Sequence, residues 1–159
     1  MDKVPQAVEV LLVEDSPTDA EFCIRTLRKR GLANDIHWVK DGAEALEFLF
    51  GPEADQQAKT LPRLILLDLH LPKVSGQEVL ARIKNNERTR SVPVVVLTSS
   101  KEDRDLTESY GLGVNSYVAK PVAFDAFVET IGQTGLYWLV VNQPCHQTRG
   151  LTDVTQPER

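Results

Sequence analysis

Five short apolar segments, each followed by a stretch of helical character, constrain the fold of this chain more than any other feature. The apolar segments lie at residues 8–13, 35–39, 64–68, 92–98 and 114–119. Most of them are apolar at nearly every position, which is typical of strands buried on both faces of a sheet. Strands that alternate with helices predict an α/β fold, here a doubly wound, five-stranded parallel sheet with helices on both faces.

Capping residues mark where the helices begin. Ser16 is an expected N-cap, followed by Pro17 at the first helical position and by Asp19 as the partner of a weak capping box. Asp41 is an expected N-cap of the second helix. The segment 51–62 is polar and bounded by prolines, so it is predicted to be an exposed loop.

The 159 residues are expected to form one domain with a short extension. The domain is predicted to span residues 8–131 and the C-terminal extension residues 132–159. Gly132 and Gly135 are expected to weaken the helix, and residues 136–141 are strongly apolar before a polar tail that is expected to end in disorder. The apolar stretch is expected either to cap the core or to form a surface for self-association.

Composition excludes several classes of function. The formal charge of −5 disfavours nucleic-acid binding through a basic face and gives no reason to expect attraction to anionic lipid. Cys23 and Cys145 stand far apart with no CxxC pair, so a disulfide framework or a zinc finger is not expected. No signal peptide or membrane-spanning run is found, and we expect a soluble, cytoplasmic protein with no membrane partner.

Reactive side chains follow four of the five predicted strands. Glu14 and Asp15 follow the first strand, Asp68 ends the third, Thr98 ends the fourth and Lys120 follows the fifth. Because ligands of open α/β sheets bind at the carboxyl ends of the strands, these side chains are expected to converge. Three neighbouring carboxylates repel one another and should recruit a cation, for which Mg²⁺ is the natural candidate.

This set of residues points to phosphoryl transfer, in which catalysis consists mostly of positioning and charge neutralisation. Asp68, alone at the end of an apolar strand, is the expected acceptor of a phosphoryl group as an acyl phosphate. Asp15 is expected to hold the metal, and Glu14 to orient the metal or its water. Thr98 and Lys120 are expected to contact the oxygens of the new phosphoryl group.

The sequence resembles the receiver domains of two-component response regulators. The resemblance covers roughly residues 8 to 131 and rests on Glu14-Asp15, Asp68, Leu71-Pro72, Gly76, Thr98, Tyr117 and Lys120-Pro121. It implies a flavodoxin-like, CheY-like fold and a signalling switch rather than an enzyme. It also implies that the backbone carbonyl of His70 binds Mg²⁺ and that Thr98 and Tyr117 form the switch. From the residues alone, a tyrosine such as Tyr117 is more often a half-buried packing residue than a switch, so its switching role rests on the resemblance.

A narrower resemblance concerns single-domain regulators that partner phytochrome-type histidine kinases. It rests on the 51–62 insertion, the sequence LILLDLHLPKVSG, the strand VPVVVLTSS and the pair Tyr137-Trp138. It implies a histidine kinase as partner, specifically a bacteriophytochrome. It also implies a homodimer through the fourth helix (102–110), the fifth strand (114–119), the fifth helix and the C-terminal extension.

The alternative function is a Mg²⁺-dependent phosphohydrolase that uses Asp68 as nucleophile. Aspartyl-phosphate phosphatases carry a second Asp two residues after the nucleophile, and here that position is His70. A phosphate-binding GxxxxGK[ST] loop is also absent from the sequence. We interpret His37, His70 and His146 as structural or surface residues, so the donor histidine is expected on the partner kinase.

Overall fold

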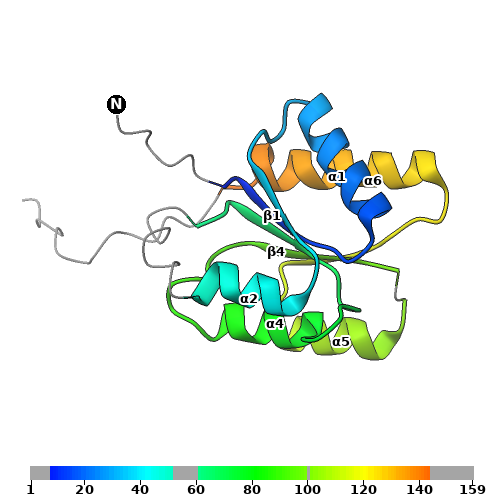
Figure 1. Cartoon of the computed structure of the whole chain (residues 1–159). Helices are drawn as coiled ribbons and strands as arrows, with labels where there is room; N and C mark the ends of the chain where they lie inside the picture. The colour runs from blue at the N-terminus through cyan, green and yellow to red at the C-terminus, as the bar shows by residue number, and fades with distance from the viewer. Residues whose placement is uncertain (1–7, 52–60, 100, 144–159) are drawn as a thin grey trace, which may run out of the picture.

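In the computed structural model, five parallel strands form one sheet in the order β2-β1-β3-β4-β5 (Figure 1). The strands are β1 (Val10–Val13), β2 (Ile36–Val39), β3 (Leu64–Leu67), β4 (Val94–Thr98) and β5 (Ser116–Ala119). The structure describes residues 8–51, 61–99 and 101–143. All five predicted strands are present, each one or two residues shorter than predicted. The predicted doubly wound α/β fold is confirmed.

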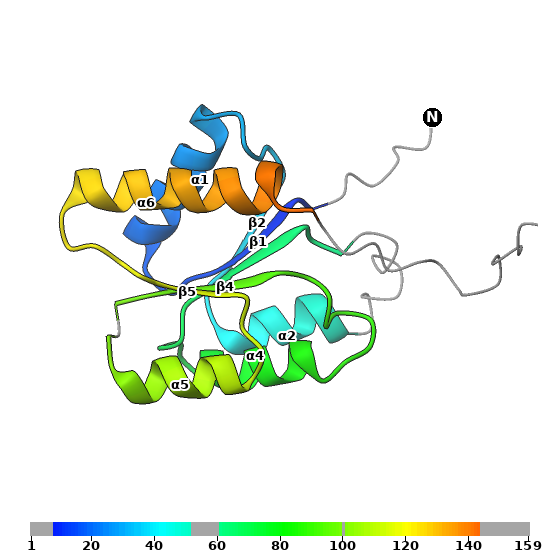
Figure 2. The same ribbon diagram turned by 180° about the vertical axis from the view of Figure 1, so that it is seen from behind.

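Helices cover both faces of the sheet, as Figures 1 and 2 show from opposite sides. Helices α1 (Pro17–Lys29) and α6 (Phe124–Leu136) lie on one face, and α2 (Gly42–Phe50), α4 (Gly76–Lys84) and α5 (Asp103–Gly111) lie on the other. The predicted N-caps are confirmed: the Asp19 amide donates to Ser16 Oγ at 3.3 Å, and the Glu44 amide donates to Asp41 Oδ1 at 2.8 Å.

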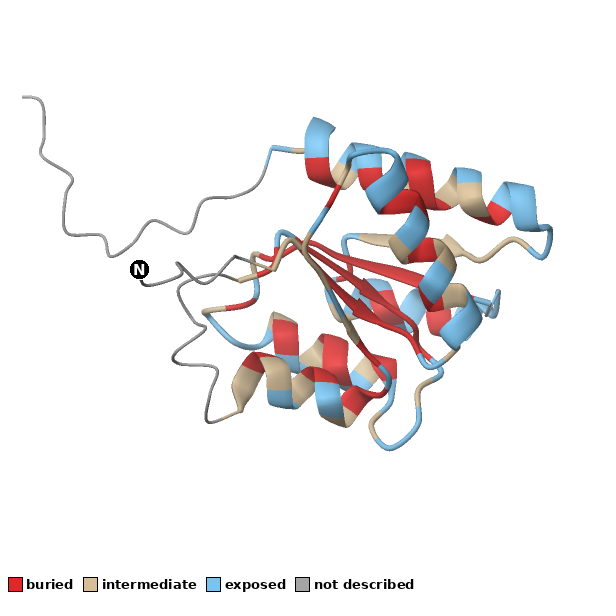
Figure 3. Cartoon of the chain, turned by 45° about the horizontal axis from the view of Figure 1, so that its top comes forward, coloured by how far each residue is buried: buried red, intermediate tan, exposed pale blue. Residues whose placement is uncertain are grey.

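The core consists of two apolar clusters, one on each face of the sheet. Leu11 and Val96 belong to the cluster beneath α2, α4 and α5, whereas Leu12 and Val95 belong to the cluster beneath α1 and α6. This alternation follows from the two-residue period of a strand, and it explains why β1, β3 and β4 are buried at every position (Figure 3). The buried central strands therefore hold the residues that follow them in fixed positions.

The last helix is longer than predicted. Helix α6 continues through Gly132 and Gly135 to Leu136, and a π-helical segment, η1 (Tyr137–Val141), follows directly. Both glycines are buried against α1, and a Cβ atom at Gly135 would lie 2.5 Å from Cδ2 of Leu27. The missing side chains let α6 approach α1 closely, so these glycines serve packing between helices and do not end the helix.

The segment η1 has an inner and an outer side. Leu139 is 3% exposed within the core, Trp138 packs against the same cluster, and the backbone carbonyl of Leu139 accepts a 2.8 Å hydrogen bond from Arg63 Nη2. The prediction that this stretch caps the core is therefore confirmed. Three apolar side chains along its outer side, and Leu136 at the end of α6, are about half exposed or more; the three are Tyr137, Val140 and Val141.

Two sequence-based predictions lie outside the described residues: most of the 51–62 loop and the disordered end of the tail. Within the described ranges, no helix has the length and apolar character needed to cross a membrane.

Candidate functional site

The candidate site lies at the carboxyl ends of the strands, where β1 and β3 are neighbours but the chain continues from them in opposite directions across the sheet. Main-chain hydrogen bonds fix the residues that follow the strands. The amide of Glu14 donates to the last residue of β2, the amide of Asp68 donates to Val13 O at 3.0 Å, and the amide of Lys120 donates to Thr98 O at 2.7 Å. The sheet thus places these side chains at one rim.

Three carboxylates at this rim could share one metal ion. Oxygen atoms of Glu14, Asp15 and Asp68 all lie within 4.8 Å of one another. Glu14 and Asp68 are buried, whereas Asp15 is exposed. Carboxylate oxygens are the donors that hard divalent cations such as Mg²⁺ prefer, and a partly open rim leaves room for water ligands. The donor set therefore fits a divalent metal.

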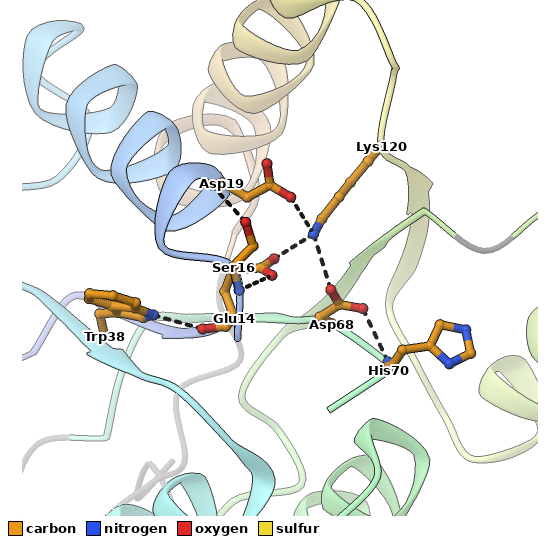
Figure 4. A network of polar contacts seen from close by, with 7 residues as sticks. All are labelled: Glu14, Ser16, Asp19, Trp38, Asp68, His70 and Lys120. Carbon is orange, nitrogen blue, oxygen red and sulfur yellow. Dashed lines mark hydrogen bonds and ion pairs between the residues drawn. The ribbon is translucent and has the colours of Figure 1, made fainter. Parts of the chain in front are cut away.

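Lys120 holds the buried part of the cluster together (Figure 4). Its Nζ atom lies 2.6 Å from Glu14 Oε2, 3.0 Å from Asp68 Oδ2 and 3.0 Å from Asp19 Oδ2. The side chain of Lys120 is only 8% exposed, so these ion pairs form in a region largely shielded from water. One ammonium group faces three carboxylates, which leaves a net negative charge for a cation to neutralise.

Asp19 was not predicted to belong to the site. The sequence assigned it to the start of α1, and its amide does bond Ser16 Oγ there. Its carboxylate, however, points across the rim to Lys120 instead of back to the cap (Figure 4). In the sequence, the feature that could have indicated this role is the position of Asp19 in the first turn of α1, only a few residues after Glu14 and Asp15.

Burial shifts the pKa values within the cluster. Desolvation raises the pKa of the Glu14 carboxyl from 4.5 to about 7, although Lys120 opposes this rise by bonding to the charged form. For Lys120, burial alone would lower the pKa, but the hydrogen bond and charge of Glu14 and the charge of Asp68 outweigh it and raise the pKa. Glu14 is thus a carboxyl that takes up a proton at near-neutral pH.

Neighbouring groups fix Glu14 and the loop after β3. The amide of Ser16 donates to Glu14 Oε1 at 3.1 Å, and the indole Nε1 of Trp38 donates to the Glu14 carbonyl at 2.8 Å. On the other side, Gly76 packs directly against Asp68 O, and a Cβ atom there would lie 2.5 Å from Leu69 Cα. The close approach of this glycine fixes the path of the chain beneath Asp68.

Thr98 and Tyr117 lie on the same face of the sheet. Thr98 is fully buried at the end of β4 and pairs in register with Ala119 of β5. Tyr117 precedes Ala119 by two residues, so its side chain is on the same face, where it packs half-buried against the core cluster beneath α2, α4 and α5. The packing interpretation of Tyr117 is confirmed by this contact, while its role in switching stays a prediction.

His70 contacts the site through its main chain. Its amide donates to Asp68 Oδ1 at 3.2 Å, but its imidazole ring is turned away from Lys120 (Figure 4). The ring Nε2 lies 3.4 Å from Oδ2 of Asp105 in α5. No acid or base from position 70 therefore enters the carboxylate cluster, which disfavours the alternative of a phosphohydrolase.

The acidic cluster lies where β1 and β3 are neighbours in a sheet of order β2-β1-β3-β4-β5. A comparison with protein-family models agrees with this arrangement. Residues 10–132 match the response regulator receiver domain. The chain belongs to this family, and the predicted class of signalling protein is confirmed.

Comparisons with individual proteins show which members of the family this chain resembles. The chain is 44% identical over 134 residues to the probable methanogenesis regulatory protein FilR2 of Methanothrix harundinacea, which covers 84% of this chain and 85% of that protein. The Mn²⁺-bound response regulator Rcp1 has a TM-score of 0.78 at 35% identity, covering 86% of this chain and 98% of the other. The phosphorylated cyanobacterial phytochrome response regulator RcpA has a TM-score of 0.80 at 32% identity, covering 89% and 100%. The predicted resemblance to phytochrome response regulators is confirmed.

Proposed function

We propose that Asp68 accepts a phosphoryl group from the phosphohistidine of a sensor kinase. The observation that carries this proposal is the position of the Asp68 carboxylate, which belongs to the cluster with Glu14 and Asp15 and also lies 3.0 Å from the Lys120 ammonium at the rim of the sheet. The same carboxylate is held by the His70 amide, so its orientation is fixed before any donor arrives. Such preorganisation supplies much of the rate of a group transfer.

In the proposed step an Asp68 carboxylate oxygen attacks phosphorus, and the bond between phosphorus and the donor imidazole nitrogen breaks. The phosphoryl group moves to Asp68 as an acyl phosphate, and the imidazole leaves with the bond's electron pair and takes up a proton. Lys120 is already 3.0 Å from Asp68 and is positioned to pair with a phosphoryl oxygen. We expect self-dephosphorylation of the product to be slow, as suits a switch.

We propose Mg²⁺ as the metal, held by Glu14, Asp15, Asp68 and the backbone carbonyl of His70. When bound, a divalent cation neutralises negative charge on the transferring phosphoryl group. Similarity to the Mn²⁺-bound Rcp1 structure supports a divalent ion, and the all-oxygen donor set supports Mg²⁺.

We propose that Thr98 and Lys120 bind the phosphoryl group on Asp68 and that the side chain of Tyr117 changes its packing when they do. A phosphoryl group adds about −1.5 to −2 charges, which favours a conformation in which hydroxyl and ammonium groups approach it. Thr98 is the last residue of β4, and Tyr117 lies on the same face of the neighbouring strand. A change at Thr98 can therefore alter the packing of Tyr117 beneath α5 and, with it, the surface of the domain.

The acceptor is tested by phosphorylation of the Asp68→Asn variant with a radiolabelled histidine kinase or with acetyl phosphate. We expect no incorporation, whereas the wild type should take up at most one phosphate that hydroxylamine releases, as it does from acyl phosphates. Asp103→Asn, an exposed acid on α5, is the matched control and should label normally. Undiminished labelling of Asp68→Asn would overturn the proposal.

We propose a phytochrome-type histidine kinase as the partner, which places the protein in the cytoplasm where such kinases use ATP. Similarity to the phytochrome response regulator RcpA supports this choice. Phosphotransfer from a purified bacteriophytochrome should be much faster than from kinases with unrelated sensor domains. Equal rates from all kinases would contradict the phytochrome partnership but would leave Asp68 as the acceptor.

We also propose that the protein forms a homodimer through α5, β5, α6 and the C-terminal extension from residue 132 onward. Support comes from exposed apolar side chains on α5, Leu106 and Tyr110, and on the outer side of η1, Val140 and Val141. Each of these side chains is more than a third exposed in one subunit, and burial against a second copy would be favourable.

Truncation is a poor test of the dimer, because Leu139 belongs to the core of the monomer. The variant Val140→Lys instead adds a charge to the exposed side of η1 and should shift sedimentation from dimer to monomer without unfolding the chain. Asn34→Lys, which adds the same charge at an exposed position beside β2, at the opposite edge of the sheet, is the control. A wild type that sediments as a monomer would overturn the proposal, as would a Val140→Lys variant that stays dimeric.

A further inference from the structure

One residue, His70, links the Asp68 carboxylate to helix α5. The main-chain amide of His70 donates to Asp68 Oδ1 at 3.2 Å, and its ring Nε2 lies 3.4 Å from Asp105 Oδ2 in α5. Asp68 directly follows β3 and Asp105 lies in α5, and His70 contacts both. The loop after β3 therefore cannot shift at His70 without straining a contact to α5.

The α5 end of this link is well fixed. The Asp105 side chain is only 11% exposed, and its other oxygen, Oδ1, accepts a 3.3 Å hydrogen bond from Gln77 Nε2 of α4. The Asp105 carboxylate thus contacts both the loop that carries His70 and helix α4, which begins where this loop ends. By contrast, the His70 side chain is 62% exposed, so its contact with Asp105 is what holds the ring against α5.

The far end of the loop is tied to a different part of the molecule. Lys73, which has a positive φ of 67°, places its Nζ atom 3.5 Å from Oδ2 of Asp41, the N-cap of α2. Among the side-chain contacts of the described residues, the His70 contact thus joins the loop to α5, whereas Lys73 joins the same loop to α2 and offers a comparison.

We propose that the His70–Asp105 pair positions the backbone carbonyl of His70 for the metal and couples metal binding to the position of α5. This inference rests on the metal site proposed above. If the metal fixes the carbonyl of His70, the ring is fixed with it and holds Asp105; conversely, an anchored Asp105 prepares the carbonyl for the metal. Thermodynamic linkage requires the two effects to be equal in size.

A double-mutant cycle tests the coupling. Free Mn²⁺ is measured by electron paramagnetic resonance during titration of the wild type, His70→Ala, Asp105→Ala and the double variant with MnCl₂. His70→Ala keeps the backbone carbonyl proposed to bind the metal, so each single variant should bind only about two- to fivefold more weakly, as is typical for loss of one partly exposed polar contact. The double variant should bind no more weakly than the weaker single variant.

Two controls separate the link from other effects. Asp103→Ala removes the same charge from an exposed position on α5 and should change Mn²⁺ affinity less than Asp105→Ala does. Lys73→Ala removes the ion pair between the loop and Asp41, and its effect on Mn²⁺ affinity should add to that of Asp105→Ala when the two variants are combined. If the losses of Mn²⁺ binding free energy in His70→Ala and Asp105→Ala simply add in the double variant, the inference is overturned.

Hydrogen exchange supplies a readout that a merely structural contact would not change. Addition of MnCl₂ should slow amide exchange in α5 of the wild type, and this protection should disappear in His70→Ala at saturating Mn²⁺. Protection of α5 that persists in that variant would overturn the inference alone. A wild type that binds no Mn²⁺ would overturn the metal site and the inference together.

Discussion

Replacement of Glu14 by Gln should remove a pH dependence of stability that originates in the buried acidic cluster. Glu14 is 1% exposed, and burial raises the pKa of its carboxyl from 4.5 to about 7 in the metal-free protein. Glutamine has nearly the same shape and can still accept hydrogen bonds from Ser16 and Lys120. The variant therefore removes the titration of this position with little change in packing.

The sign and size of the effect follow from linkage. A carboxyl whose pKa is higher in the folded than in the unfolded state stabilises the fold when protonated, so its contribution is complete below pH 4.5 and is lost as the pH rises through about 7. Each unit of pKa corresponds to about 1.36 kcal/mol. Relative to Glu14→Gln, the wild type should therefore lose about 3 kcal/mol of unfolding free energy between pH 4.5 and 7.

The measurement is urea denaturation in EDTA at pH values from 4.5 to 8, followed by tryptophan fluorescence. Trp38 bonds the Glu14 carbonyl and should report local as well as global unfolding. Glu21→Gln, which removes an exposed acid from α1, is the control and should run parallel to the wild type. Parallel curves for the wild type and Glu14→Gln would refute the assignment of a raised pKa to Glu14.

Four further predictions concern packing and metal binding. Gly76→Ala should destabilise the fold by about 1–3 kcal/mol in urea denaturation and weaken metal binding, because the added methyl group meets the backbone of Asp68 and Leu69. Gly135→Val should cost about 1–3 kcal/mol through its clash with α1, whereas Gly111→Ala, where nothing lies within 4 Å, should stabilise by about 0.4–1 kcal/mol. Mg²⁺ at a hundred times its Kd should add about 2.7 kcal/mol to the unfolding free energy, an effect that EDTA should abolish. A stable Gly135→Val variant or a Mg²⁺-independent midpoint would contradict the respective prediction.

Local sequence patterns, together with the rule that parallel strands end at the same edge of a sheet, were enough to predict the fold and most residues of the candidate site. Apolar runs identified the strands, and Ser16 and Asp41 identified helix starts, because capping depends on residues close in sequence. Parallel strands all end at the same edge of a sheet, so the residues after them were expected to meet. Glu14, Asp68 and Lys120 do meet, although they are more than 50 residues apart in sequence.

The contacts that could not be predicted depend on the relative placement of whole helices. The Asp19 carboxylate meets Lys120 only because the Lys120 side chain, which follows β5, extends across the rim to the first turn of α1. The partner of the His70 ring depends on how α5 packs against α4. Gly132 and Gly135 resemble helix breakers in sequence, and only the close packing of α6 on α1 shows why they are tolerated within a helix.

The hydrogen bond from Arg63 to Leu139 has a consequence for signalling over distance. Arg63 stands immediately before β3 and Asp68 immediately after it, so this bond anchors η1 at the opposite end of the strand from the acidic rim. Four strand residues span about 13 Å. If Asp68 is phosphorylated as proposed, the phosphoryl group therefore lies too far from η1 to contact it, and we expect any effect on η1 to pass through a small displacement of the sheet or of α6.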